Sequence, residues 1–243
     1  MTRPVGILGG MGPAATVLLM RKVIAAVPGR DDADHIPLLV DQNPQVPSRI
    51  AWLIEGRGED PGPVLARMAQ RLEAMGAEAL AMPCNTAHHF VAQIRNAVDI
   101  PLLDMVDLTI ARIRERADAG SPIGILASPA IRKTALFDKA LAAIEMRAIY
   151  PEDQDGLLDA IRRIKSAGRV EPARAALAEA SADLRRRGAK TQLIACTEFS
   201  TIAEAVTETV QTIDTLDRLV EAIISFSTGH TFRNVDAEAA EPA

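Results

Sequence analysis

Aromatic side chains, cysteines and long apolar stretches are all scarce in this chain of 243 residues. Aromatic residues make up only 3% of it, so the core must be built from aliphatic side chains. With two cysteines, a disulfide-stapled fold is not expected. No apolar run approaches the roughly 18 residues that a membrane span needs, and no signal peptide precedes the first strand-like run. These absences favour a cytoplasmic protein.

The chain also lacks a basic excess, because 27 Lys and Arg face 32 Asp and Glu and give a formal net charge of −5. An acidic chain without a basic stripe argues against nucleic acid as a partner. What the chain has in quantity is hydrophobic residues, at 48%. At this length they are sufficient for one large α/β domain or two small ones.

Short apolar runs alternate with longer segments of helical periodicity. This alternation predicts an α/β fold in which parallel sheets are covered by helices. The predicted strands are 5–8, 36–40, 79–82, 101–103, 123–126, 146–149, 192–195 and 210–213, and the clearest helices are 14–27, 63–75, 157–167 and 172–187.

Three predicted strand ends recur in the same order along the chain, each with a similar sequence. The clearest pair is Ala81–Thr86 and Leu193–Glu198, each of which contains a cysteine. We therefore expect two similar halves, 1–107 and 108–209, with the segment from about 210 to 228 packing back on the first. Residues 229–243 lack periodicity and are expected to be disordered. Ligands of open α/β sheets bind beyond the carboxyl ends of the strands, so the halves are expected to face each other across a cleft.

Cys84 and Cys196 each follow a buried strand and precede a polar segment, at matching places in the repeat. For one cysteine alone, a buried structural role would be an equally good interpretation; the matched pair favours function. The start of a helix after each cysteine would stabilise a thiolate, with Asn85 and Thr86 as capping residues. A disulfide between the two is disfavoured in the cytoplasm.

Two thiols on opposite sides of a substrate suit racemisation at a Cα atom. The reaction removes a proton from one face and returns a proton to the other, which two groups do by exchanging roles. A thiol titrates near enough to neutrality to serve as either acid or base. Backbone amides at helix starts would stabilise the enolate-like carboxylate that forms.

Five segments, in this order, resemble the aspartate/glutamate racemase family and its aspartate racemase branch: Gly6–Pro13 (GILGGMGP), Asp41–Arg49 (DQNPQVPSR), Pro83–His88 (PCNTAH), Ile164–Gly168 (IKSAG) and Cys196–Glu198 (CTE). The third and fifth together are the specific ones. The resemblance spans most of the chain, through Asp214. It implies a pseudo-symmetric two-domain α/β fold, catalysis by Cys84 and Cys196, no pyridoxal phosphate or metal, and a homodimer.

The resemblance also implies the substrate contacts. Met11 is expected to line the pocket. Asn85, Thr86 and Thr197 are expected to hold the α-carboxylate, while Arg49 and Lys165 bind the distal carboxylate of an acidic amino acid. Ser128 and Glu198 complete the set of predicted substrate-binding residues.

One segment departs from the family pattern. After the strand 123–126 the family usually has Thr-Thr-Gly-Thr, whereas this chain has Ser128-Pro-Ala-Ile131, and Phe137 stands in place of the family's Tyr. Ile131 replaces a hydroxyl by an alkyl group, which leaves the choice between aspartate, glutamate and a broader substrate range open.

Two weaker patterns are set aside. The run Gly10–Ala15 loosely fits a dinucleotide-binding turn, but Pro13 interrupts it. His88 follows Cys84 by four residues, yet no further histidine has the spacing of a metal ligand. We expect His88 to satisfy polar groups behind the pocket.

Other functions remain open at this point. Maleate-type isomerisation or malonate decarboxylation also uses cysteine with carboxylate-binding loops. A non-catalytic amino-acid-binding protein is a further alternative, although a binder needs neither thiol.

Overall fold

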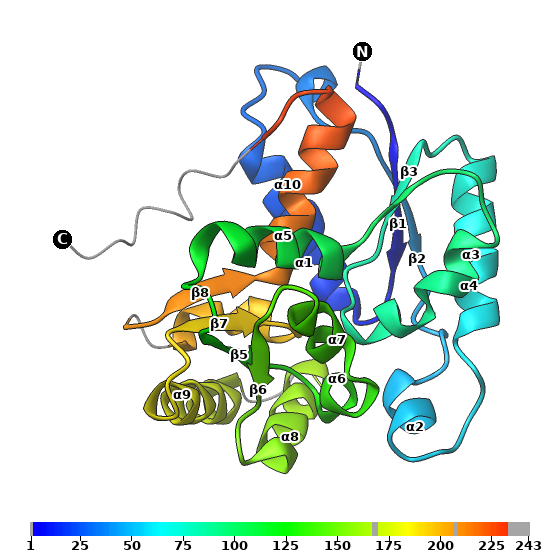
Figure 1. Ribbon diagram of the computed structural model, residues 1–243. Helices are drawn as coiled ribbons and strands as arrows, with labels where there is room; N and C mark the ends of the chain where they lie inside the picture. The colour runs from blue at the N-terminus through cyan, green and yellow to red at the C-terminus, as the bar shows by residue number, and fades with distance from the viewer. Residues whose placement is uncertain (1, 167–169, 207–208, 233–243) are drawn as a thin grey trace.

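The computed structural model describes residues 2–166, 170–206 and 209–232. It contains two four-stranded parallel sheets, ordered β2-β1-β3-β4 and β6-β5-β7-β8 (Figure 1). The first sheet consists of β1 (Val5–Gly9), β2 (Leu38–Gln42), β3 (Ala79–Ala81) and β4 (Leu102–Leu103). The second consists of β5 (Pro122–Leu126), β6 (Arg147–Ile149), β7 (Thr191–Ile194) and β8 (Gln211–Asp214). The predicted α/β class is confirmed, and each of the eight predicted strands is present within two residues.

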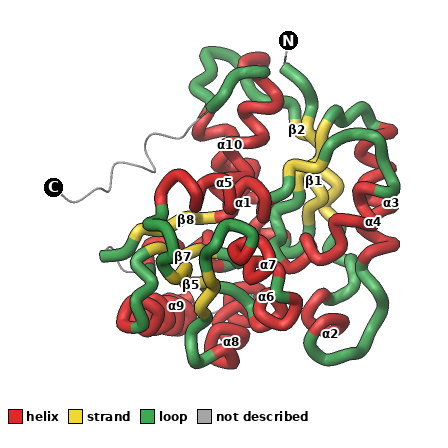
Figure 2. The backbone as a smooth tube through the Cα atoms, viewed as in Figure 1, coloured by secondary structure: helices red, strands yellow, loops and turns green. Residues whose placement is uncertain are grey.

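Helices flank both sheets (Figure 2). They are α1 (Pro13–Ala26), α2 (Arg49–Leu53), α3 (Gly62–Ala74), α4 (Val91–Arg95), α5 (Met105–Arg116), α6 (Pro129–Thr134), α7 (Leu136–Ala142), α8 (Gln154–Lys165), α9 (Val170–Arg186) and α10 (Thr215–Thr228). Short 3-10 helices are η1 (Asp32–Asp34), η2 (Thr86–Phe90) and η3 (Phe199–Ala205). No helix in the described part of the chain is long and apolar enough to cross a membrane.

The helix that follows the last strand of each sheet covers the other sheet. Helix α5 follows β4 of the first sheet, but its Val106 and Ile113 are buried in one cluster with Ile123 and Ile125 of β5. Helix α10 follows β8 of the second sheet, and its leucines are buried in one cluster with Val5 and Ile7 of β1. Aspartates end the preceding strands and cap both helices: Asp104 accepts from Val106 N, and Asp214 accepts from Leu216 N. The two sheets are thus bound together by crossed helices.

The segment expected to pack back from about residue 210 therefore divides in two. Strand β8 pairs with β7 in the second sheet, whereas α10 contacts the first. The division at 107 and 209 stays a prediction. The tail from 233 onwards, where disorder is expected, lies outside the described residues.

The turn between β1 and α1 requires glycine. Gly10 has φ of +91°, and a Cβ atom there would overlap the backbone of Asn43. Its amide donates to Thr16 Oγ1 at 2.9 Å, which ties the turn to α1. The turn thereby places the next residue, Met11, among the residues that line the site described below.

Gly10→Ala is therefore expected to destabilise the protein by about 3 kcal/mol or more, because backbone strain and overlap add. For a chain of this size that lowers Tm by roughly 6–12 °C. Gly76→Ala is the matched control: Gly76 has φ of +98°, but nothing lies within 4 Å of the added Cβ. Thermal unfolding of both variants checks this expectation, and an equal loss in both would contradict the role assigned to the overlap.

Candidate active site

Both cysteines open into one cavity of about 360 Å³. Cys84 follows β3 and Cys196 follows β7, and each is 7% exposed. Met11 and Ser128, which follow β1 and β5, line the same cavity. The cavity therefore lies beyond the carboxyl ends of strands from both sheets, where a parallel sheet is expected to bind ligand.

Most of the predicted site residues gather at this cavity. Besides the two cysteines, the lining includes the predicted residues Met11, Arg49, Thr86, Ser128, Lys165 and Glu198. They come from loops and helix ends that are far apart in the sequence, which the fold brings together.

Asn85 and Thr197 are the two predicted residues that do not line the cavity. Asn85 is 2% exposed, and its Nδ2 donates to Thr215 Oγ1 at 2.9 Å; its side chain makes no capping hydrogen bond to η2. Thr197 Oγ1 donates to the carbonyl of Pro83 at 3.0 Å. Both side chains therefore link one cysteine-bearing loop to the opposite half of the chain.

Cys196 and Glu198 are buried and lie beside the exposed Lys165. Its Sγ donates to Glu198 Oε2 at 3.1 Å, and Glu198 Oε1 pairs with Lys165 Nζ at 2.8 Å. Burial, and next the Glu198 carboxylate, raise the pKa of the Cys196 thiol well above its usual range, although Lys165 opposes them. Cys196 is accordingly a protonated thiol at neutral pH, ready to act as an acid.

Lys165 lies close enough to Cys84 and Cys196 to interact electrostatically with a negative charge on either. Burial works to lower its pKa, but Glu198 and the negative charge of either cysteine thiolate outweigh burial, so the pKa is raised. Lys165 therefore stays cationic and favours the thiolate form of Cys196.

Arg49 is the first residue of α2, which Ser48 caps by accepting from Ala51 N. Its Nη1 donates to the carbonyls of Val46 and Pro47, and these bonds fix the guanidinium at the cavity wall. Its Nε is buried and has no hydrogen-bond partner within the described ranges. A guanidinium fixed at the cavity wall is suited to a carboxylate.

The departing segment after β5 has a clear structural role. Ser128 lines the cavity, and its Oγ lies 3.3 Å from Thr86 Oγ1. Ile131 and Phe137 are fully buried in the cluster around β5 instead. The alkyl group of Ile131 therefore fills the core and does not face the cavity.

The cavity lining also includes residues that the sequence motifs do not predict, among them Glu55, Arg57, Leu158, Ile161 and Arg162. The sequence does contain a signal for some of these residues. Positions 158, 161, 162 and 165 share one face of a helix, so once Lys165 is assigned to the site, the other three are expected to line it as well. Glu55 and Arg57, in the loop after α2, carry no such signal. Among the described residues, no three His, Cys, Asp or Glu side chains are grouped as a metal site requires.

The chain is similar in sequence to known racemases. Residues 8–223 match a family model described as Asp/Glu/Hydantoin racemase. The broad specificity amino-acid racemase RacX of Bacillus subtilis (strain 168) is 25% identical over 226 residues, which are 91% of this chain and 96% of that protein.

Among solved structures, Picrophilus torridus aspartate racemase has a TM-score of 0.85 and 25% identity, covering 97% of this chain and 98% of that one. Glutamate racemase of Francisella tularensis subsp. tularensis SCHU S4, solved with D-glutamate, has a TM-score of 0.61 and 17% identity, covering 96% and 85%. At that identity the second likeness shows the fold alone.

Proposed function

Because the chain belongs to the Asp/Glu/Hydantoin racemase family, we propose that it interconverts the L and D forms of aspartate or glutamate without pyridoxal phosphate. The observation that carries this proposal is the cavity, in which one thiol from each half of the chain faces the same space. A two-base proton transfer needs that arrangement.

In one direction, Cys84 as thiolate removes the Cα proton while the thiol of Cys196 gives its proton to the opposite face. The products are a protonated Cys84, a deprotonated Cys196 and the inverted amino acid. In the reverse direction the two cysteines exchange roles. The hydrogen bond from Cys196 to Glu198 supports this assignment, because it holds a proton on Cys196 before the substrate arrives.

The charge of the cavity wall supports a dicarboxylic substrate. Arg49 and Lys165, the cations that the resemblance assigns to the distal carboxylate, both line the cavity, and Thr86 and Ser128 offer hydroxyls for the α-carboxylate. A positive charge held close to the reacting carbon also stabilises the negative charge that develops in the transition state. Thr197 contributes by holding the two cysteine-bearing loops together, and Asn85 by tying the Cys84 loop to Thr215, which donates to the carbonyl of Ile194 at the end of β7.

Proton NMR of the purified protein with L-aspartate and then L-glutamate in D₂O, without pyridoxal phosphate, tests the proposal. We expect the Cα signal to disappear and the D form to accumulate on chiral analysis. Neutral amino acids belong in the same panel, because the Bacillus relative is named for broad specificity. Light scattering of the same sample checks the homodimer that the resemblance implies.

Each alternative function gives a distinct result in this experiment. An isomerase acting on a double bond, tested with maleate, would change the alkene signals, and a decarboxylase, tested with a malonate, would release CO₂. A binding protein would leave every Cα signal in place, and that result would overturn the proposal.

A further inference from the structure

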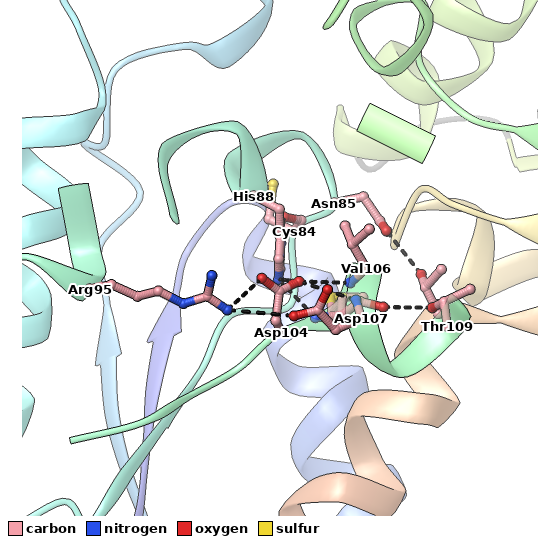
Figure 3. Close-up of polar contacts among 10 residues, drawn as sticks. Cys84, Asn85, His88, Arg95, Asp104, Val106, Asp107 and Thr109 are labelled. Carbon is pink, nitrogen blue, oxygen red and sulfur yellow. Dashed lines mark hydrogen bonds and ion pairs between the residues drawn. The ribbon is translucent and has the colours of Figure 1, made fainter. Parts of the chain in front are cut away.

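His88 lies in η2, directly behind Cys84, and is 4% exposed. Its Nδ1 is 2.9 Å from the carbonyl oxygen of Cys84 (Figure 3). Its Nε2 is 3.1 Å from the backbone nitrogen of Met105, the first residue of α5. The imidazole thus joins the turn that carries Cys84 to the helix that packs on the second sheet.

These two contacts define the protonation state of His88. The amide of Met105 can only donate, so Nε2 must accept, and the ring proton must be on Nδ1, where it donates to the Cys84 carbonyl. An imidazolium would place an N–H group against the Met105 N–H. Burial lowers the pKa of His88, and the neighbouring Asp104 only partly opposes this, so the neutral ring is favoured.

The charged groups around His88 form hydrogen bonds and ion pairs with one another and with the backbone. Asp104 Oδ1 is 3.9 Å from His88 Nε2, but it accepts from the amide of Val106 at 2.9 Å. Its other oxygen accepts from Arg95 at 3.0 Å, and Arg95 also pairs with Asp107 at 3.6 Å (Figure 3). None of these charged groups replaces the Cys84 carbonyl as the acceptor of the hydrogen bond from His88 Nδ1–H.

The second half of the chain holds its cysteine differently. The carbonyl of Cys196 accepts from the backbone amides of Phe199 at 2.8 Å and Ser200 at 3.3 Å. Ser200 follows Cys196 by four residues, as His88 follows Cys84, and its hydroxyl donates to Asp214. The carbonyl of Cys84 is therefore held by the side chain of His88, whereas the carbonyl of Cys196 is held by backbone amides.

We propose that His88 is a positioning residue for the racemase reaction: its Nδ1–H group fixes the Cys84 turn, and its Nε2 accepts from the first residue of α5, which keeps the ring proton on Nδ1. The inference rests on the proposed function, in which Cys84 exchanges a proton with Cα. Orientation of this kind has large kinetic effects, since a misplacement of about 1 Å costs on the order of 100-fold in rate.

Two substitutions separate the two contacts. His88→Asn places an amide N–H near the position of Nδ1 and keeps the donor to Cys84. His88→Gln places an amide oxygen near the position of Nε2 and keeps only the acceptor for Met105. Ser200→Ala is the matched control, because the backbone amides that hold Cys196 remain.

We expect His88→Gln to lower kcat by roughly 30- to 100-fold with KM changed less than about threefold. His88→Asn is expected to retain kcat within about fivefold, and Ser200→Ala within about twofold. Equal kcat losses in the Asn and Gln variants, or a loss in Ser200→Ala as large as in His88→Gln, would overturn the proposal.

A spectroscopic measurement on the unaltered protein keeps the proposal testable even where His88→Gln does not fold. Long-range ¹H–¹⁵N NMR distinguishes ring tautomers, and the chain has only four histidines. We expect a neutral Nδ1–H signal at pH 7, assigned by its loss in His88→Asn. A neutral Nε2–H form or an imidazolium at this pH would contradict the inference.

Alkylation of the thiols separates failure of this inference from failure of the proposed function. We expect iodoacetamide to modify Cys84 faster in His88→Gln than in the unaltered protein, with the rate at Cys196 unchanged, as read by mass spectrometry. If the unaltered protein racemises nothing, the proposed function fails, and the tautomer and alkylation results still decide the role of His88. An unchanged Cys84 rate would overturn that role.

Discussion

Cys84→Ser and Cys196→Ser are each expected to lower kcat for racemisation by at least about 1,000-fold, since each removes one of two groups that act as a unit. A serine hydroxyl is far less acidic than a thiol, so it neither forms the base nor releases the proton readily. Each replaced side chain is small and 7% exposed, so the fold is expected to survive. Chiral chromatography of both reaction directions measures the loss.

The two variants are also expected to differ in a way that assigns the cysteines. Cys196→Ser retains Cys84, which can remove the Cα proton of one enantiomer and return a deuteron to the same face. That enantiomer would exchange in D₂O without inverting, and Cys84→Ser would exchange the other enantiomer. Circular dichroism provides the control for folding. A folded single variant that racemises at more than a tenth of the parental rate would contradict the two-thiol mechanism.

Lys165→Met is expected to lower kcat/KM by roughly 100- to 1,000-fold, because it leaves the buried carboxylate of Glu198 without its partner and removes a cation from the cavity. Glu198→Gln keeps the shape of the side chain and loses its charge, so its effect is expected to be smaller. The double variant should be more active than Lys165→Met alone, since the stranded charge is then gone. Steady-state kinetics of the three variants completes a double-mutant cycle.

The same variants are expected to move the titration of Cys196 in opposite directions. Glu198 raises the pKa of Cys196 and Lys165 lowers it. Lys165→Met should therefore shift the alkylation of Cys196 to higher pH, and Glu198→Gln should shift it to lower pH. Shifts in the same direction in both variants would contradict the charge arrangement described for the cavity.

Most strands were predictable from the sequence because they are short apolar runs bounded by polar or turn-forming residues. The fully buried run Val5–Gly9 is the clearest example. The packing of α5 on the second sheet was not predictable. Periodicity shows which face of a helix is buried but does not show which sheet that face covers. Short helices such as α2 have too few residues to show a period.

The sequence predicts a site residue well where the type of side chain determines its role. It predicts poorly where the role depends on the direction in which the side chain points. The cysteines, Arg49 and Lys165 were found through motifs and do line the cavity. Asn85 and Thr197 lie beside the cysteines in sequence, yet their side chains turn toward the opposite half of the chain. The backbone conformation of a loop controls such directions, and neither composition nor spacing encodes it visibly.

The crossed helices have a consequence for the distance between the two thiols. Because α5 and α10 each seal the sheet of the other half, wide rotation of the halves about a hinge would expose apolar surface on both sheets. The segment around α2 packs on the first core through Leu53, and its polar contacts with the second half are exposed ones, from Lys133 Nζ to the carbonyl of Ile54 and from Arg162 to Glu55. Exposed polar contacts of that kind break at little energetic cost. The distance between the two thiols is thus held by the most deeply packed part of the molecule.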